Sequence, residues 1–151
     1  MRHFDIAHFA EIRQSLPTSE VCTSVPFTDA CLVTARGALT KQPLGWNNVE
    51  GFLKACYGSW GQKGCFSVNS MREFADIPPK TRQIMIANMT KAHQFLIDNL
   101  AAARGGTDDN ESLADLIIMF FCGICLEQNL DPDRARITKK IDAFMRLIRA
   151  I

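Results

Sequence analysis

The sequence predicts an all-α fold, arranged as a multi-helix bundle. Apolar residues recur at steps of three and four through most of the second half, which is the spacing of one face of a helix. Proline, glycine and Asp-Asn clusters fall at the ends of these periodic stretches, where helices begin and end. No segment alternates apolar and polar residues for long enough to make a convincing strand. We therefore expect six or seven helices and no sheet.

Size and composition fit one globular domain. The chain has 151 residues, of which 47% are hydrophobic, and this share argues against disorder. Seventeen Lys and Arg are balanced by 16 Asp and Glu, so composition gives no sign of a basic surface that grips nucleic acid. The longest apolar run, residues 116–121, is far shorter than the roughly 20 residues of a membrane span. The N-terminus carries no secretion signal, so we expect a cytoplasmic protein without a membrane partner.

The first half predicts shorter helices separated by polar breaks. Residues 4–16 have an amphipathic pattern, and residues 28–39 begin with a Thr-Asp pair that is typical of a helix cap. A further helix is expected from Asn47 or Asn48 to about residue 61, after a break that contains proline and glycine. We divide the chain into a poorly defined helical and loop segment, residues 1–46, and a main domain, residues 47–151.

The second half predicts three long helices. Pro78-Pro79 starts the first, and Gly105-Gly106 ends it. The second, about residues 111–129, is apolar over more than half its circumference and should be buried on most sides. The last begins after an Asp-Pro-Asp turn and carries a seam that steps by 4, 3, 4 and 3 residues: Ile137, Ile141, Phe144, Ile148 and Ile151. A seam that stays apolar to the final residue favours a partner that covers it.

The cysteines do not form a recognisable reactive or metal site. Cys65 opens the helix predicted for residues 64–76, where we interpret it as a small buried residue at a tight entry. Cys122 and Cys125 have the CxxC spacing of zinc knuckles and thiol oxidoreductases. They lie inside an apolar helix with no second CxxC and no nearby histidine, so we predict that they are core residues. No phosphate-binding loop, dinucleotide fingerprint, Glu-x-x-His pair or catalytic triad is present, and we expect no enzyme activity, metal or cofactor.

A loose group of methionine and aromatic side chains falls on three adjacent predicted helices. It has two interpretations, the ordinary core or the wall of an adaptable apolar pocket, because methionine and aromatic side chains repack around varied ligands. The group contains Tyr57, Trp60, Phe66, Met71, Phe74, Met85, Met89 and Phe95.

Several motifs in fixed order resemble the C-terminal domain of TetR-family transcriptional regulators. Gly64-Cys65-Phe66-Ser67-Val68-Asn69-Ser70 is followed by Glu73 and by a proline-started helix that contains Arg82. An alanine-rich helix end at Ala101-Ala102-Ala103-Arg104, an apolar helix with an internal glycine at Gly123, and the final helix complete the series. The resemblance covers about residues 47–151.

The resemblance implies an all-helical domain that binds a small apolar effector and forms a homodimer through its last two helices. The dimer interface would contain Leu116, Phe120, Ile124, Ile137, Ile141, Phe144 and Ile148. The effector pocket would lie among the middle helices and contain Cys56, Trp60, Phe66, Met71, Phe74, Met85, Met89, His93 and Phe120.

Residues 1–46 depart from the family pattern. They hold no match to the Gly-Val-Ser turn and the Tyr and Phe of its helix-turn-helix, so DNA is a partner only if such a motif exists, and no DNA contact is assigned. We expect a TetR-like regulator or a fragment of one. Two alternatives stay open. One is a helical adaptor that forms mixed dimers with a full-length regulator, and the other is a small metal or thiol protein that uses Cys122, Cys125 and His93.

Overall fold

A computed structural model describes residues 37–60, 79–131 and 133–151, and every regular element in these ranges is an α-helix. This confirms the predicted all-α class. The helices are α3 (Trp46–Trp60), α5 (Pro79–Arg104), α6 (Asp109–Leu130) and α7 (Arg134–Arg149). The helices predicted for residues 4–16 and 64–76 lie outside the described residues. No described helix is long and apolar enough to cross a membrane.

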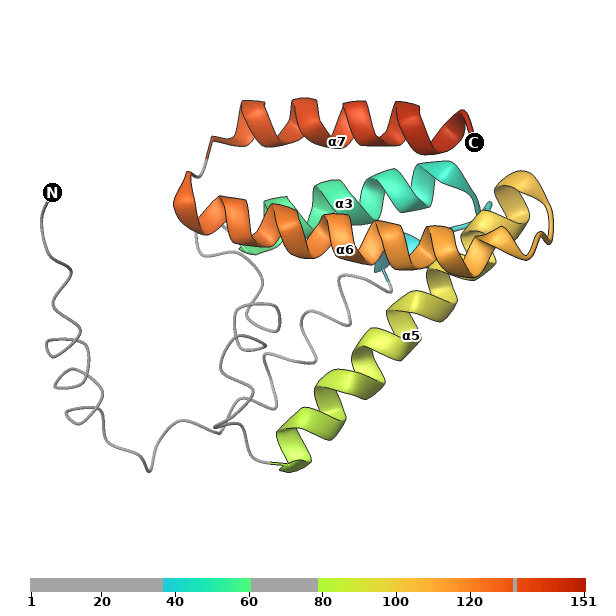
Figure 1. The fold of residues 1–151 in the computed structure, drawn as a ribbon, viewed down its shortest axis with the longest axis horizontal. Helices are drawn as coiled ribbons and strands as arrows, with labels where there is room; N and C mark the ends of the chain where they lie inside the picture. The colour runs from blue at the N-terminus through green and yellow to red at the C-terminus, as the bar shows by residue number, and fades with distance from the viewer. Residues whose placement is uncertain (1–36, 61–78, 132) are drawn as a thin grey trace, which may run out of the picture.

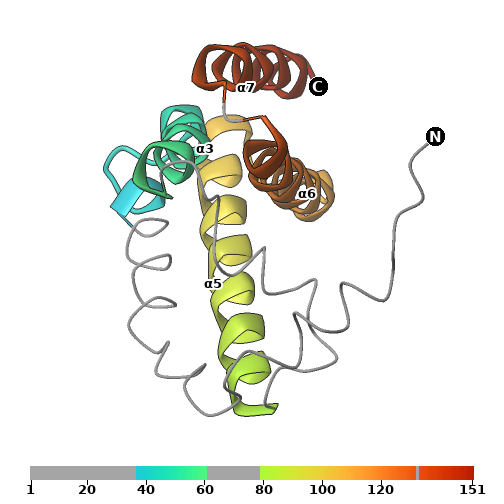
Figure 2. The same cartoon turned by 90° about the vertical axis from the view of Figure 1, so that its left-hand side faces the viewer.

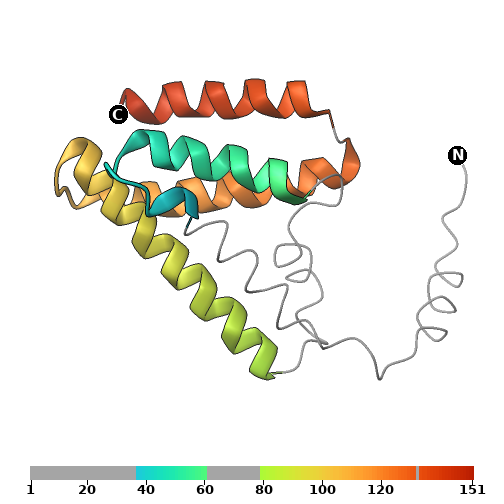
Figure 3. The ribbon, with the colours of Figure 1, turned by 180° about the vertical axis from the view of Figure 1, so that it is seen from behind.

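The described helices form a layered bundle. α3 and α6 run in the same direction beneath α7, which runs the opposite way (Figure 1). Viewed end-on, α7 sits over the line between α3 and α6 (Figure 2), and it contacts both of them. α5 crosses under the bundle at a steep angle and packs on α3 and α6, while its first half leads away from the other helices (Figure 3). This arrangement leaves one side of α6 and α7 without a described neighbour.

The core lies where the four helices meet. Val49, Phe52 and Leu53 of α3 are buried, as are Leu96 and Leu100 of α5. The main apolar core side chains of the last two helices are also nearly inaccessible to solvent. They are Leu113, Ile117, Phe121, Ile124 and Cys125 of α6, and Ile137, Ile141, Met145 and Ile148 of α7.

Backbone and capping groups set the helix ends where the sequence predicts them. Gly105 has a φ of +88°, which favours glycine, and its N–H donates to the carbonyl of Ala101 at 2.9 Å. Asp133 caps α7, because its carboxylate accepts from the N–H groups of Ala135 and Arg136 at 2.9 and 3.2 Å. The turn before α7 is therefore fixed by local chemistry.

A buried asparagine anchors the segment that leads into α3. Asn99 of α5 donates through Nδ2 to the carbonyls of Leu39 and Phe95, each at 2.8 Å. Its Oδ1 accepts from the N–H of Gly45 at 2.9 Å, and Gly45 has a φ of +148°. Asn99 thus binds backbone groups 60 and 54 residues away. No local sequence pattern indicates this long-range contact.

The apolar seam predicted on the last helix does not form one exposed surface, because most of it is buried. Ile137, Ile141 and Ile148 are at most 2% exposed, and Ile124 of α6 is 5% exposed. The chain's own helices cover these four side chains, so they are not available to a second copy. The physical reason is tertiary packing, because α7 lies on both α3 and α6, and this packing buries Met145 and leaves Phe144 half-buried. The remaining predicted interface residues, Leu116, Phe120 and Phe144, lie on a neighbouring stripe that solvent reaches.

Candidate dimerisation surface

An apolar surface spans the solvent-facing sides of α6 and α7, and we call it the α6–α7 face. Two of its side chains on α6 are largely exposed, Leu116 at 50% and Met119 at 69%, as are Leu147 at 64% and Ile151 at 71% near the end of the chain. The complete face contains Leu116, Met119, Phe120 and Gly123 of α6 with Phe144, Leu147 and Ile151 of α7. Only Phe120 and Phe144 are half-buried.

These side chains form one continuous surface because of how the two antiparallel helices pair. Phe120 stacks on Phe144, with ring centroids 3.8 Å apart and planes inclined by 10°. Leu116 lies one turn before Phe120 on α6, and Leu147 lies one turn after Phe144 on α7. Because the helices run in opposite directions, these two leucines lie at the same level. Large exposed apolar patches of this kind mark sites of interaction with another molecule.

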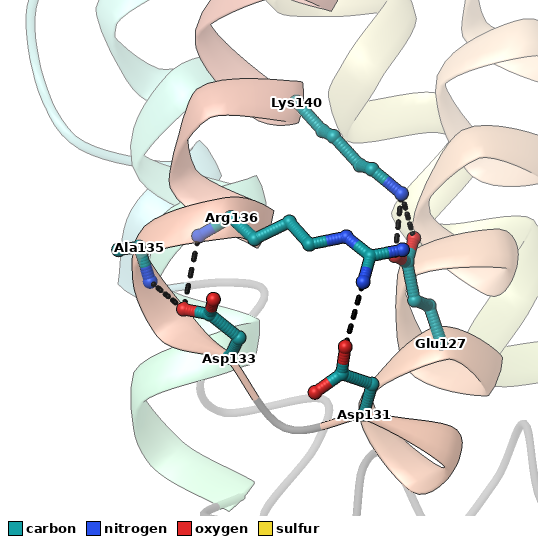
Figure 4. A network of polar contacts seen from close by, with 6 residues as sticks. All are labelled: Glu127, Asp131, Asp133, Ala135, Arg136 and Lys140. Carbon is teal, nitrogen blue, oxygen red and sulfur yellow. Dashed lines mark hydrogen bonds and ion pairs between the residues drawn. The ribbon is translucent and has the colours of Figure 1, made fainter.

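An ion-pair network closes one end of the α6–α7 face (Figure 4). Glu127 of α6 binds both Lys140 and Arg136 of α7, and the Arg136 contact is 3.1 Å long. Arg136 also binds Asp131 at 2.6 Å. The hydrogen bond from Lys140 lowers the pKa of Glu127 below its ordinary value. The network holds the start of α7 against the end of α6.

A second set of ion pairs holds the opposite flank of α7 on α3. Glu50 binds Arg149 at 2.7 Å, and Lys54 binds Asp142 at 2.9 Å. Glu50 and Lys54 also bind each other at 2.8 Å, and the hydrogen bond from Lys54 is the main reason that the pKa of Glu50 is lowered. With ion pairs on both flanks, α7 has little freedom to roll, so its exposed stripe stays beside that of α6.

Gly123 has no role in packing within the described fold. It lies inside α6 and is exposed, and a Cβ added there would meet nothing within 4 Å. Glycine in the interior of an exposed helix is unfavourable by roughly 0.5–1 kcal/mol relative to alanine. The neighbour that would pack against it is not among the described residues.

The CxxC pair lies beside this glycine, and neither cysteine forms a disulfide. Cys125 is buried, which confirms the core prediction for that residue, whereas Cys122 is half-buried. Among the described residues, no group of three or more His, Cys, Asp or Glu side chains is placed to hold a metal ion.

The predicted effector pocket is only partly within the described residues. Met85, Met89 and His93 lie on one stripe of α5; Met85 is buried, and the other two are half-buried. Phe120 stacks on Phe144 of α7, and its place in the pocket stays a prediction. Cys56 and Trp60 lie in the last turns of α3, where only the backbone is described, and Phe66, Met71 and Phe74 lie outside the described residues.

His93 connects the predicted pocket stripe to α6. Its Nε2 lies 3.0 Å from Oδ1 of Asp115, a residue that precedes Leu116 of the α6–α7 face. The same Nε2 atom is buried without a hydrogen-bond partner, so the short distance does not reflect hydrogen-bond geometry.

No protein-family model, curated protein or solved structure matches this chain.

Proposed function

We propose that this chain is the dimer-forming regulatory domain of a TetR-like transcriptional regulator, and that the α6–α7 face joins two copies. One observation carries the proposal. The exposed apolar side chains gather on the last two helices, which is where the TetR resemblance puts the dimer contact. The residues differ from those that the sequence predicts, because the isoleucine seam is inside the core.

The physical basis is the cost of leaving this surface in water. Burying a leucine or methionine side chain is worth roughly 1.5–3 kcal/mol. Leu116, Met119, Leu147 and Ile151 are each at least half exposed, and a symmetric dimer would cover all four in both copies. Gly123 would let a helix of the second copy approach closely, and this accounts for a glycine that the single chain does not need.

The effector part of the proposal depends on α5. Met85, Met89 and His93 would supply one wall of an apolar effector site along one stripe of α5. The first half of this helix leads away from the other described helices (Figure 1). Flexible methionine side chains suit ligands of varied shape. No DNA contact is assigned to any residue of this chain.

Two substitutions test the homodimer. Met119→Glu and Leu147→Glu each place a charge in an interface that would be desolvated, so each should raise the dissociation constant by about 100-fold or more. Sedimentation equilibrium at micromolar concentration measures this change. Ile86→Glu is the matched control, because Ile86 is an equally exposed apolar residue, at 56%, on a different helix.

A wild-type chain that sediments as a monomer at these concentrations would contradict the homodimer. In that case, binding of a full-length helix-turn-helix regulator to the same face would support the mixed-dimer adaptor. Equal weakening by Ile86→Glu would show that the effect is not specific to the α6–α7 face.

A further inference from the structure

The two helices of the α6–α7 face carry charges of opposite sign. All four charged residues of α6 are acidic: Asp109, Glu111, Asp115 and Glu127. α7 carries six basic residues and one acidic residue: Arg134, Arg136, Lys139, Lys140, Arg146 and Arg149, with Asp142. The nearly neutral total of the chain therefore hides a strong separation of charge between two neighbouring helices.

Ion pairs within the chain involve only some of these charged side chains. Glu127 binds Arg136 and Lys140, and Arg149 binds α3. Lys139 and Arg146 of α7 are exposed and form no ion pair with any described residue, and Glu111 of α6 is likewise exposed and unpaired there. Asp115 keeps 71% of its side chain exposed beside His93.

Asp115 and Arg146 border the α6–α7 face on its two outer edges. Asp115 is one turn from Met119, and its contact with His93 puts it on the side toward α5. Arg146 precedes Leu147, and it follows Asp142 by one turn on the side of α7 that is held by α3. Measured from the stacked Phe120 and Phe144 at 1.5 Å per residue, the two positions differ in level by only about 5 Å.

Two symmetric arrangements of this face differ in which helices meet. A two-fold axis across the helices would put α6 on α6 and α7 on α7, so like charges would face each other. A two-fold axis parallel to the helices would put α6 of each copy on α7 of the other, at nearly the same level, with the outer edges aligned. Opposite charges would then meet. This second arrangement is favoured, because contacts between like charges disfavour the first one by several kcal/mol.

Building on the proposed homodimer, we infer that α6 of each copy packs against α7 of its partner, and that Asp115 of one copy facing Arg146 of the other selects this pairing. The second copy is the occupant that the charges favour, because the acidic helix and its basic complement lie on one chain. The pair occurs twice in a symmetric dimer. Salt should weaken the dimer, since exposed charges are screened within about 8–10 Å at physiological ionic strength.

Charge reversal tests the pairing. Asp115→Lys alone, or Arg146→Glu alone, places like charges at both symmetric contacts and should weaken self-association about tenfold. The double variant restores two attractive contacts and should dimerise nearly as well as wild type. An equal mixture of the two single variants should form heterodimers that are tighter than either homodimer, as measured by sedimentation with one variant labelled. Helix content by circular dichroism confirms that each variant is folded.

The outcomes separate this inference from the proposed function. If both single variants dimerise like wild type, or the double variant stays as weak as the singles, the α6-on-α7 pairing is overturned while the homodimer stands. If the wild-type chain is monomeric, the homodimer fails, and the pairing fails with it. Recovery in the double variant together with preferential heterodimers supports the pairing.

Discussion

At the scale of single residues, some of the contacts that stabilise the fold are polar, and no local sequence pattern indicates them. Asn99 lies on α5 among residues of the apolar stripe, and nothing in its neighbourhood marks it as an anchor. Its function depends on the backbone of Leu39 and Gly45, which are far away in the sequence. Local signals such as the Gly105 stop and the Asp133 cap could be predicted, because their partners lie within four residues.

Asn99→Ala should destabilise the fold by about 3 kcal/mol, because the N–H of Gly45 and the carbonyl of Leu39 would lose their buried partner. Urea denaturation, under conditions where the chain is monomeric, measures the loss. Gln94→Ala is the control, since Gln94 is exposed on the same helix and its side chain bonds, among the described residues, only to Asp98. Equal losses for the two variants would show that the anchor contributes nothing of its own.

At the scale of helices, α7 shows what periodicity predicts and what it leaves open. The start, the cap and the amphipathic character of α7 follow from its sequence. Its apolar residues form two adjacent stripes, however, and a heptad count merges them. The packing of α3 and α6 decides that Ile141 is buried and Leu147 is exposed, and this long-range information is absent from the helix itself.

The ion pairs that flank α7 should make stability depend on pH. The pKa values of Glu127 and Glu50 are lowered in the fold from an ordinary 4.5, so their contribution is fully present above that value and disappears as the pH falls through the lowered values. Glu127→Gln should therefore lower the free energy of unfolding at pH 7, and the gap from wild type should narrow as the pH falls through the lowered pKa of Glu127. Urea denaturation from pH 7 to pH 3 measures it.

Glu111→Gln is the control for this pH series, because Glu111 forms no ion pair with a described residue. It should show little difference from wild type at neutral pH. A gap between Glu127→Gln and wild type that stays constant down to pH 3 would contradict the role of the Glu127 carboxylate in holding α7.

At the scale of the whole molecule, the helical class was predictable, because the apolar spacing of α5, α6 and α7 needs no tertiary information. For the candidate site, the sequence predicted the two helices that carry it but not all of its residues. Leu116 and Phe144 were expected at the interface, whereas Met119 and Leu147 were missed because they fall outside the counted seam. The sequence does place Met119 one turn before Gly123, and this pair could have indicated the solvent-facing side of α6.

Gly123→Ala tests the whole assembly, because it should have opposite effects on the single chain and on the dimer. In the single chain, no described residue lies within 4 Å of the new Cβ, so the gain in helix propensity should stabilise the fold by about 1 kcal/mol. In the proposed dimer, the same methyl group would separate two closely packed helices and weaken association about tenfold. Urea denaturation of the dilute monomer and sedimentation equilibrium measure the two effects separately.

Gly51→Ala on α3 has the same open space around its Cβ and should stabilise the chain without changing association. Unchanged or tighter association of Gly123→Ala would mean that no partner helix approaches α6 at this position.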